Sequence, residues 1–342
     1  MEKVLIIYTG GTIGMTPTEN GYAPKAGYFT RALESMAELR SPEMPPWDII
    51  EMDPLLDSSN VTVREWNAIG ETISRNYQSY RGFVVVHGTD TMAYTASALS
   101  FMLENLNKPV VLTGAQIPLC EIRSDGRYNL INALAIASDG VVNEVSLYFG
   151  GRLLRGNRAT KSSADKLVAF RSFNYPNLAE ADITIKYNFP ALRRAPGGSF
   201  RFQPLDNIPI CVLKIFPGIQ FGLFEDMITD RLRGLVIETF GTGNIPGGGS
   251  GLIPIIKKAF SHGAAVIVCS QCPQGTVSLG AYETSSALKR AGAVSGRDMT
   301  TEAAVAKLYY LFSKGCGIDF VKALMERDIA GELTEELFSP SK

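Results

Sequence analysis

Residues 4–14, VLIIYTGGTIG, join a short apolar run to a glycine-rich turn. Similar β-branched runs recur along the first half of the chain, each followed by glycine or polar residues, as is typical of buried parallel strands. Segments with helical spacing lie between them, and this alternation predicts a parallel sheet with helices on both faces. The predicted strands are 4–8, 83–86, 110–113 and 145–149, and the predicted helices are 63–78, 91–105 and 128–138.

The alternation stops at residues 183–209, where four prolines, a Gly-Gly pair and no sustained apolar period indicate a linker. It then resumes, with predicted strands at 210–216, 235–240 and 265–270 and predicted helices at 252–262, 302–313 and 318–327. A chain of 342 residues has room for two domains. We therefore predict an α/β fold of two domains: a larger N-terminal catalytic domain at 1–185 with a mostly parallel, flavodoxin-like sheet, a linker at 186–209, and a smaller C-terminal α/β domain at 210–342.

The composition restricts the partners of this chain. With 33 Lys and Arg against 34 Asp and Glu, the net charge is −1 and there is no basic run, which excludes nucleic acid as a main partner. No apolar stretch approaches the roughly 18 to 20 residues of a membrane helix, and no export signal precedes the first strand. Five cysteines without framework spacing favour a reducing compartment. We expect a cytoplasmic protein with no membrane partner.

Four segments carry polar side chains that could do chemistry. Thr12 lies in the glycine turn after the first strand, which lacks both the spacing of a dinucleotide fingerprint and the lysine of a P-loop. Thr89 and Asp90 follow strand 83–86, Lys161 follows strand 145–149, and the polar run 57–59 follows an apolar one. Taken singly, each has an ordinary explanation as a turn, a helix cap or a surface charge.

Together these residues suit acyl transfer through threonine. A threonine hydroxyl is a poor nucleophile near neutral pH, so it needs a proton acceptor, and a desolvated lysine beside a carboxylate supplies one. The two histidines, His87 and His262, fall in different predicted domains. They form neither a metal site nor a histidine-based triad, and His87 is predicted to be a packed, hydrogen-bonded residue.

The same motifs resemble those of a known family. TGGTIG at 9–14 and HGTDTMAYTASAL at 87–99 look like the two signatures of the bacterial-type L-asparaginase/glutaminase family, and GNRATK at 156–161 fits its lysine segment. Order, spacing and length agree over nearly the whole chain, and most closely with the cytoplasmic type I branch. The resemblance implies an amidohydrolase that converts L-asparagine to L-aspartate and ammonia through a covalent acyl-enzyme, with no cofactor and no metal.

The resemblance also implies a role for each site residue. Thr12 is the expected nucleophile, with Thr89 in reserve, because family members differ on this point. Thr89, Asp90 and Lys161 form a second triad, in which Lys161 takes and returns protons through Thr89. Tyr22, in the segment NGYAP, is expected to close over the site beside Thr12. The expected substrate-binding residues are Asp57, Ser58, Ser59, Thr89 and Asp90.

The type I branch often has a second asparagine site, for an effector, in its C-terminal domain. The matching segments here are 238–244 and 270–272, and the candidate effector residues are Glu238, Ser270, Gln271 and Cys272. An arginine is expected at position 238 in allosteric members, and a glutamate there repels the effector carboxylate. The resemblance further implies a homo-oligomer, a dimer or a tetramer, with the active site near an intersubunit surface.

Three alternatives stay open. The ammonia-releasing subunit of a tRNA-dependent amidotransferase carries an extra domain before TGGT, which here begins at residue 9. A catalytically inactive amino-acid-binding sensor on the same fold is expected to lack Thr12 or Lys161, and both are present. A nicotinamide-dependent oxidoreductase needs an acidic residue about 20 positions after the glycine turn, where residues 28–31 read YFTR.

Overall fold

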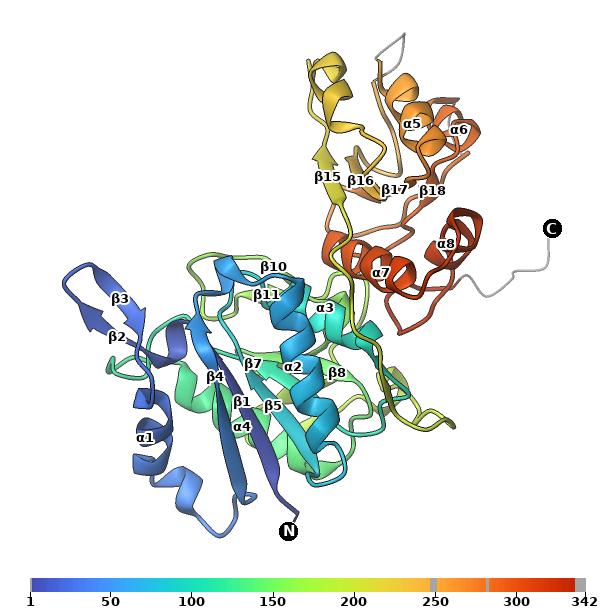
Figure 1. The fold of residues 1–342 in the computed structure, drawn as a ribbon. Coiled ribbons are helices and arrows are strands. Elements are labelled where there is room, and N and C mark those ends of the chain that lie inside the picture. The colour runs from blue at the N-terminus through green and yellow to red at the C-terminus, as the bar shows by residue number, and fades with distance from the viewer. Residues whose placement is uncertain (1, 247–250, 281–282, 336–342) are drawn as a thin grey trace. The chain divides into compact units, whose positions relative to one another are not determined.

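The computed structural model describes residues 2–246, 251–280 and 283–335. The chain divides into two compact units, Met1–Pro204 and Leu205–Lys342 (Figure 1). Each unit is built around a largely parallel sheet with helices packed on it, so the predicted fold class is confirmed. No helix in the described ranges is both long enough and apolar enough to span a membrane.

The first unit contains an eight-stranded sheet of order β13-β12-β9-β8-β7-β5-β1-β4. Strands β4, β1, β5, β7 and β8 are parallel, and the remaining three extend the sheet through antiparallel pairs. Their bounds are β1 (Val4–Gly10), β4 (Trp47–Leu56), β5 (Gly82–Val86), β7 (Val110–Thr113), β8 (Val145–Phe149), β9 (Arg152–Arg155), β12 (Ala179–Ala181) and β13 (Ile185–Tyr187). All seven residues of β1 are buried, because helices cover both faces of the sheet.

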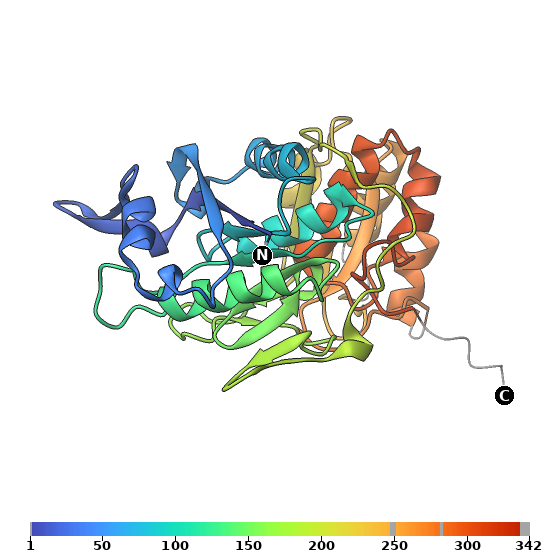
Figure 2. The ribbon, with the colours of Figure 1, turned by 90° about the horizontal axis from the view of Figure 1, so that it is seen from below.

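Helices pack on both faces of this sheet. One face packs against α1 (Tyr28–Ser35) and α4 (Gly126–Asp139), whose apolar residues share a core with Val4, Ile6 and Tyr8 of β1. Helices α2 (Val63–Asn76) and α3 (Met92–Met102) cover the other face, and Figure 2 shows α2 and α4 on opposite sides. The start of α2 is fixed by a capping box between Thr62 and Glu65.

Two short strand pairs, β6 (Leu103–Glu104) with β14 (Arg201–Phe202) and β12 with β13, change the predicted end of one helix and the predicted start of the linker in the first unit. The helix predicted at 91–105 ends at Met102, because residues 103–104 form β6 and pair with β14. Through β13 and β14, the part of the predicted linker up to residue 204 packs with the first unit. The unit also contains the hairpin β2 (Met15–Thr18) and β3 (Gly21–Pro24), and the pair β10 (Thr160–Lys161) and β11 (Phe170–Arg171).

The second unit contains a four-stranded parallel sheet of order β15-β16-β17-β18. The strands are β15 (Ile210–Lys214), β16 (Gly234–Thr239), β17 (Ala265–Ser270) and β18 (Val294–Ser295). The helices are α5 (Leu252–Ser261), α6 (Glu283–Arg290), α7 (Thr301–Ser313) and α8 (Ile318–Met325). The predicted strand at 265–270 matches β17, and the other predicted elements of this unit differ from the observed ones by one or two residues at their ends.

A buried ion pair fastens the segment after α8 to α7. Lys307 Nζ lies 2.5 Å from Glu332 Oε1, and neither side chain is exposed. The Lys307 ammonium also donates to the backbone carbonyls of Met325 and Arg327, and Glu332 accepts from the backbone N–H of Ala330 at 2.7 Å. The charges are compensated by each other and by these backbone groups, as burial of charge requires.

Candidate active site

The predicted site residues lie in loops at the carboxyl ends of neighbouring parallel strands. Thr12 follows β1, residues 57–59 follow β4, and Thr89 follows β5. Since β1 pairs with both β4 and β5, these three loops emerge side by side at one edge of the sheet. Ligands of open α/β sheets bind at such an edge.

Two glycines let these loops touch. A Cβ placed on Gly11 lies 2.4 Å from the Cα of Gly88, and one placed on Gly88 lies 2.6 Å from Ser58 Oγ. Gly11 also has a φ of 85°, which side chains rarely adopt. The backbones after β1 and β5 are therefore in contact, and Thr12 and Thr89 follow directly on them.

We expect Gly11→Ala to destabilise the protein and abolish its activity. The added methyl group meets backbone atoms that cannot move aside alone, so the free energy of unfolding should fall by about 3 kcal/mol. Gly197→Ala is the control, because its added Cβ meets nothing within 4 Å. Denaturant unfolding of both variants tests this, and equal stability of the two contradicts the close approach of the loops.

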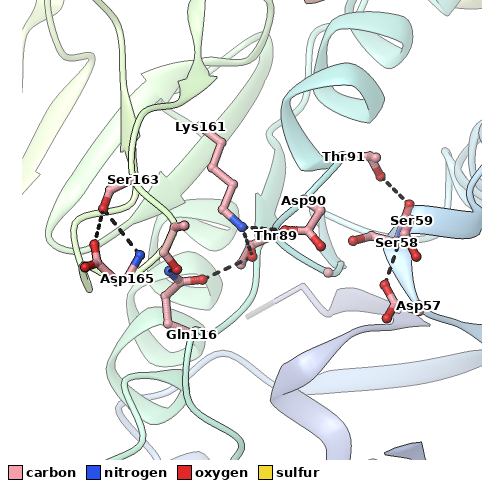
Figure 3. Close-up of polar contacts among 12 residues, drawn as sticks. Asp57, Ser58, Ser59, Thr89, Asp90, Thr91, Gln116, Lys161, Ser163 and Asp165 are labelled. Atoms are coloured by element: carbon pink, nitrogen blue, oxygen red, sulfur yellow. Dashed lines mark hydrogen bonds and ion pairs between the residues drawn. The ribbon is translucent and has the colours of Figure 1, made fainter.

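Lys161 joins the loop after β5 to the short strand β10. Its Nζ donates to Thr89 Oγ1 at 2.8 Å and to Asp90 Oδ1 at 2.6 Å (Figure 3). The Lys161 side chain is 20% exposed and the Asp90 side chain 63%. A largely desolvated amine thus lies between a hydroxyl and a carboxylate that remains open to solvent, as a proton relay at a binding surface requires.

Gln116, which the sequence analysis missed, completes this cluster. Its Nε2 donates to the backbone carbonyls of Ala164 and Lys166 at 3.1 and 3.2 Å. Carbonyls can only accept, so Gln116 Oε1 must face Thr89 and accept the Thr89 hydroxyl proton at 3.1 Å (Figure 3). Thr89 therefore donates to Gln116 while it accepts from Lys161. Gln116 follows β7, so the strand-end rule could have found it.

The loop after β4 is tied to the loop after β5. Thr91 Oγ1 donates to the backbone carbonyl of buried Ser58 at 2.7 Å. Asp57 Oδ1 accepts from Ser59 N at 3.0 Å and so caps the short 3₁₀ helix Ser58–Asn60. Asp57 does not cap α2, whose N-cap is Thr62. The predicted substrate-binding residues 57–59 thus lie beside the Thr89–Lys161 cluster, as Figure 3 shows.

Thr12 and Tyr22 lie outside this hydrogen-bonded cluster. Thr12 is half-buried in the 3₁₀ helix Thr12–Gly14, and within the part of the chain that the structure describes its hydroxyl has no hydrogen-bond partner. Tyr22 lies on the projecting β2–β3 hairpin, 49% exposed, and its hydroxyl donates to Glu121 Oε1 at 2.5 Å (Figure 1). This hydrogen bond to a carboxylate raises the pKa of Tyr22.

His87 is a packed residue, as predicted. Trp66 Nε1 donates to Thr95 Oγ1, which donates to His87 Nε2, each at 3.0 Å. The His87 Nδ1 proton goes to the Gly88 carbonyl at 2.7 Å, since a carbonyl can only accept. Burial lowers the pKa of His87 to about 4. The imidazole is therefore neutral near pH 7, with both nitrogens engaged.

We expect His87 to make stability depend on pH between about 6.5 and 4. The unfolded chain binds a proton at His87 below about pH 6.5, and the folded chain does not until about pH 4. Stability contributed by the neutral ring is thus lost as pH falls, by up to about 3 kcal/mol. Denaturant unfolding at pH 7 and pH 4.5 measures this loss. It should be smaller in His87→Gln and unchanged in His262→Gln; an equal loss in all three proteins contradicts the assignment.

The candidate effector residues lie at the ends of β16 and β17 in the second unit. Gln271 Nε2 donates to the backbone carbonyls of Ile215 and Glu238 at 2.6 and 2.8 Å. Ser270 Oγ donates to the Gly241 carbonyl and accepts from Cys272 N. These polar groups are therefore engaged with the unit's own loops.

Glu238 itself has two partners in the second unit. Its Oε1 accepts from Thr301 Oγ1 at 2.6 Å, and its Oε2 lies 4.0 Å from Lys214 Nζ. A carboxylate thus occupies the position where an effector-binding arginine is expected.

In the described ranges, no three His, Cys, Asp or Glu side chains group closely enough to hold a metal ion.

A parallel α/β sheet with threonines, a lysine and carboxylates gathered at one edge suits an amidohydrolase, because these groups can transfer an acyl group without a cofactor. The chain belongs to the asparaginase family: the family model "Asparaginase, N-terminal" matches residues 3–193, and "Glutaminase/Asparaginase C-terminal domain" matches residues 209–325. The resemblance noted in the sequence is thereby confirmed, and so is the prediction of an enzyme of this family.

Individual relatives agree with this placement. The chain is 44% identical to L-asparaginase 1 of Escherichia coli over 98% of this chain and 99% of that protein. The crystal structure of L-asparaginase I from Vibrio cholerae is 45% identical, covers 98% and 99% of the two chains, and superposes with a TM-score of 0.90. The thermostable L-asparaginase from Thermococcus kodakarensis is 32% identical, covers 98% and 100%, and gives a TM-score of 0.87.

Proposed function

We propose that this chain hydrolyses L-asparagine to L-aspartate and ammonia through an acyl-enzyme on threonine. The observation that carries the proposal is that the Lys161 amine donates hydrogen bonds to both Thr89 and Asp90. The loop of Thr89 and Asp90 contacts the loop that contains Thr12. Relatives named L-asparaginase that match the whole chain support the substrate.

In the proposed reaction, the Thr12 hydroxyl oxygen bonds to the carbon of the side-chain amide. Its proton passes to Thr89, whose own proton turns from Gln116 to the Lys161 amine, and Lys161 then gives a proton to the nitrogen as the C–N bond breaks and ammonia leaves. Water then cleaves the ester, releases aspartate and restores the Thr12 hydroxyl. Backbone N–H groups in the glycine-rich turns around Thr12 and Thr89 would stabilise the oxyanion, each donor contributing about 3 kcal/mol.

The remaining predicted residues bind the substrate. In the proposal, Asp90 and Asp57 face the α-ammonium group, and Ser58 and Ser59 hold the α-carboxylate. Tyr22 closes over the site beside Thr12, which requires it to leave Glu121, so the observed hydrogen bond corresponds to the open position. No cofactor or metal takes part, and we infer a cytoplasmic homo-oligomer, a dimer or a tetramer.

Ammonia release from L-asparagine and L-glutamine, each over a concentration series, tests the proposal. We expect release from L-asparagine by the full chain. Saturable asparagine binding without any ammonia contradicts the proposal and favours the amino-acid-binding sensor. The shape of the asparagine curve tests the effector residues: a hyperbola is expected, because Glu238 repels a second asparagine carboxylate, and a sigmoidal curve indicates an effector site.

We propose that Gln116 positions Thr89, and we expect Gln116→Met to lower kcat about tenfold with little change in KM. Without this hydrogen bond, Lys161 alone holds the Thr89 hydroxyl oxygen, so the distance and direction from Thr89 to Lys161 are less well fixed. Gln116→Glu keeps an acceptor for the Thr89 hydroxyl, so its kcat should stay closer to that of wild type than the kcat of Gln116→Met does. Lower stability of Gln116→Met with unchanged kcat and KM indicates a merely structural role.

A further inference from the structure

The second unit contains a cavity of about 390 Å³ that takes no part in the proposed reaction. Its walls come from the loop 276–279, the region of β18, the last turn of α6, and α8 with the residue that follows it. Three cationic side chains line it, Lys289, Arg297 and Lys322, together with one carboxylate, Glu326.

The three cations have no carboxylate partner among the residues described. Lys307 and Lys214 of the same unit are each within 4.0 Å of a carboxylate, but no such ion pair involves Lys289, Arg297 or Lys322. Lys322 instead lies over the ring of Phe260, with its Nζ 4.3 Å from the centroid. Like charges around one cavity repel each other, and a bound anion relieves the repulsion.

Arg297 departs from ordinary structure in two ways at this cavity. Its φ is 51°, in the left-handed region that arginine rarely occupies. Its Nε is buried, and no group in the described part of the chain accepts from it. The backbone is held in this conformation from both sides, because Arg297 N donates to Ser295 Oγ and Arg297 O accepts from Val277 N, each at 2.9 Å. An unsatisfied buried donor on a fixed, strained residue is typical of a ligand site.

Glu326 is fixed in the same wall. Its Oε1 accepts from Ser295 N at 3.1 Å. The backbone carbonyls on either side of it, those of Met325 and Arg327, both accept from buried Lys307. The Glu326 carboxylate is therefore held in place before any ligand binds. The cavity wall thus carries one negative charge, from Glu326, beside the positive charges of Lys289, Arg297 and Lys322.

We propose that this cavity binds a small amino dicarboxylate, of which L-aspartate is the simplest. The carboxylates of the ligand face the three cations, and its ammonium group faces Glu326. A ligand with two negative groups and one positive group matches this wall more closely than a simple dianion, which Glu326 repels. Because L-aspartate is also the product of the proposed reaction, a role in sensing product rests on the proposed function; the binding site itself does not.

Calorimetric titration of the full-length protein with L-aspartate, succinate and inorganic phosphate tests this inference. We expect a binding event for L-aspartate that Lys322→Met and Arg297→Met each weaken about tenfold or more, since each removes a charge-assisted contact. Lys257→Met, which changes an exposed lysine on α5 outside the cavity, should leave the event unchanged. Glu326→Gln should weaken binding of L-aspartate and strengthen that of succinate.

Two results overturn the inference. In one, the three cavity variants Lys322→Met, Arg297→Met and Glu326→Gln bind L-aspartate as the wild type does, with folding confirmed by thermal unfolding. In the other, phosphate or succinate binds the wild type as tightly as L-aspartate, so the cavity does not recognise an ammonium group. Both are distinct from failure of the proposed function, which appears as absence of ammonia release from L-asparagine in the wild type.

Discussion

Lys161→Met is expected to lower kcat for L-asparagine by about 10³-fold or more. Lys161 hydrogen-bonds both Thr89 and Asp90. In the proposed reaction it is the amine that moves the threonine proton. Methionine keeps much of the side-chain volume but can neither donate nor accept a proton. Ammonia release measures the loss, and Lys186→Met, an exposed lysine on β13, serves as the control for loss of a surface charge.

Lys161→Arg separates proton transfer from simple positive charge. Arginine keeps the cation but does not deprotonate near neutral pH. If Lys161 carries the proton, this variant is as inactive as Lys161→Met. Activity within about tenfold of wild type in Lys161→Arg indicates that Lys161 acts as a fixed charge, and the same result for Lys161→Met removes it from the reaction.

Thr12→Ala is expected to lower kcat by a similar factor and to prevent the acyl-enzyme from forming. Thr12 is half-buried on a turn that touches the Thr89 loop, and in the proposed reaction its hydroxyl attacks a substrate held there. Mass spectrometry of the protein quenched during turnover should detect the aspartyl adduct in wild type and in Thr12→Ser. It should not detect the adduct in Thr12→Ala.

Thr89→Val provides the opposite test. If Thr12 is the nucleophile, loss of the Thr89 hydroxyl slows the relay but leaves the residue that carries the adduct. If the adduct disappears in Thr89→Val and persists in Thr12→Ala, Thr89 is the nucleophile and Thr12 a supporting residue. The thermal midpoint of Thr12→Ala should lie close to that of wild type, because the described residues offer its hydroxyl no hydrogen-bond partner. Thr89→Val should unfold at a somewhat lower temperature, because it removes two hydrogen bonds from a buried residue.

The strands that carry the site could be predicted because their physical origin is local. Short, largely apolar runs such as 110–113 and 145–149 are buried along their whole length, and their boundaries coincide with those of β7 and β8. Loops at the carboxyl ends of neighbouring parallel strands lie at one edge of the sheet, so Thr12 and Thr89 could be grouped from the strands predicted before them. The place of residues 57–59 beside Thr89 depended on the family resemblance, because β4 was not predicted. Lys161 depended on the family resemblance, because a single lysine in a sequence resembles a surface charge.

What the sequence did not reveal depends on tertiary contacts. β4 is an edge strand with several exposed positions and a proline, so it lacks the apolar run of β1. β6 ends α3 through pairing with residues nearly a hundred positions away, which no local pattern encodes. Gln116 was missed because its role depends on the carbonyls of Ala164 and Lys166. The left-handed backbone of Arg297 likewise has no signal in composition or periodicity.

The order of strands in the first sheet also bears on how the protein is made. Strand β1, which lies next to the edge strand β4, is synthesised first, yet it pairs with β4 and β5, which emerge from the ribosome later. A nascent chain that has reached β8 contains both threonines but not the lysine that joins them. Long-range parallel pairing of this kind is slow and leaves apolar edges exposed while the chain grows. Activity during refolding should therefore appear only once the sheet is complete, later than helix content.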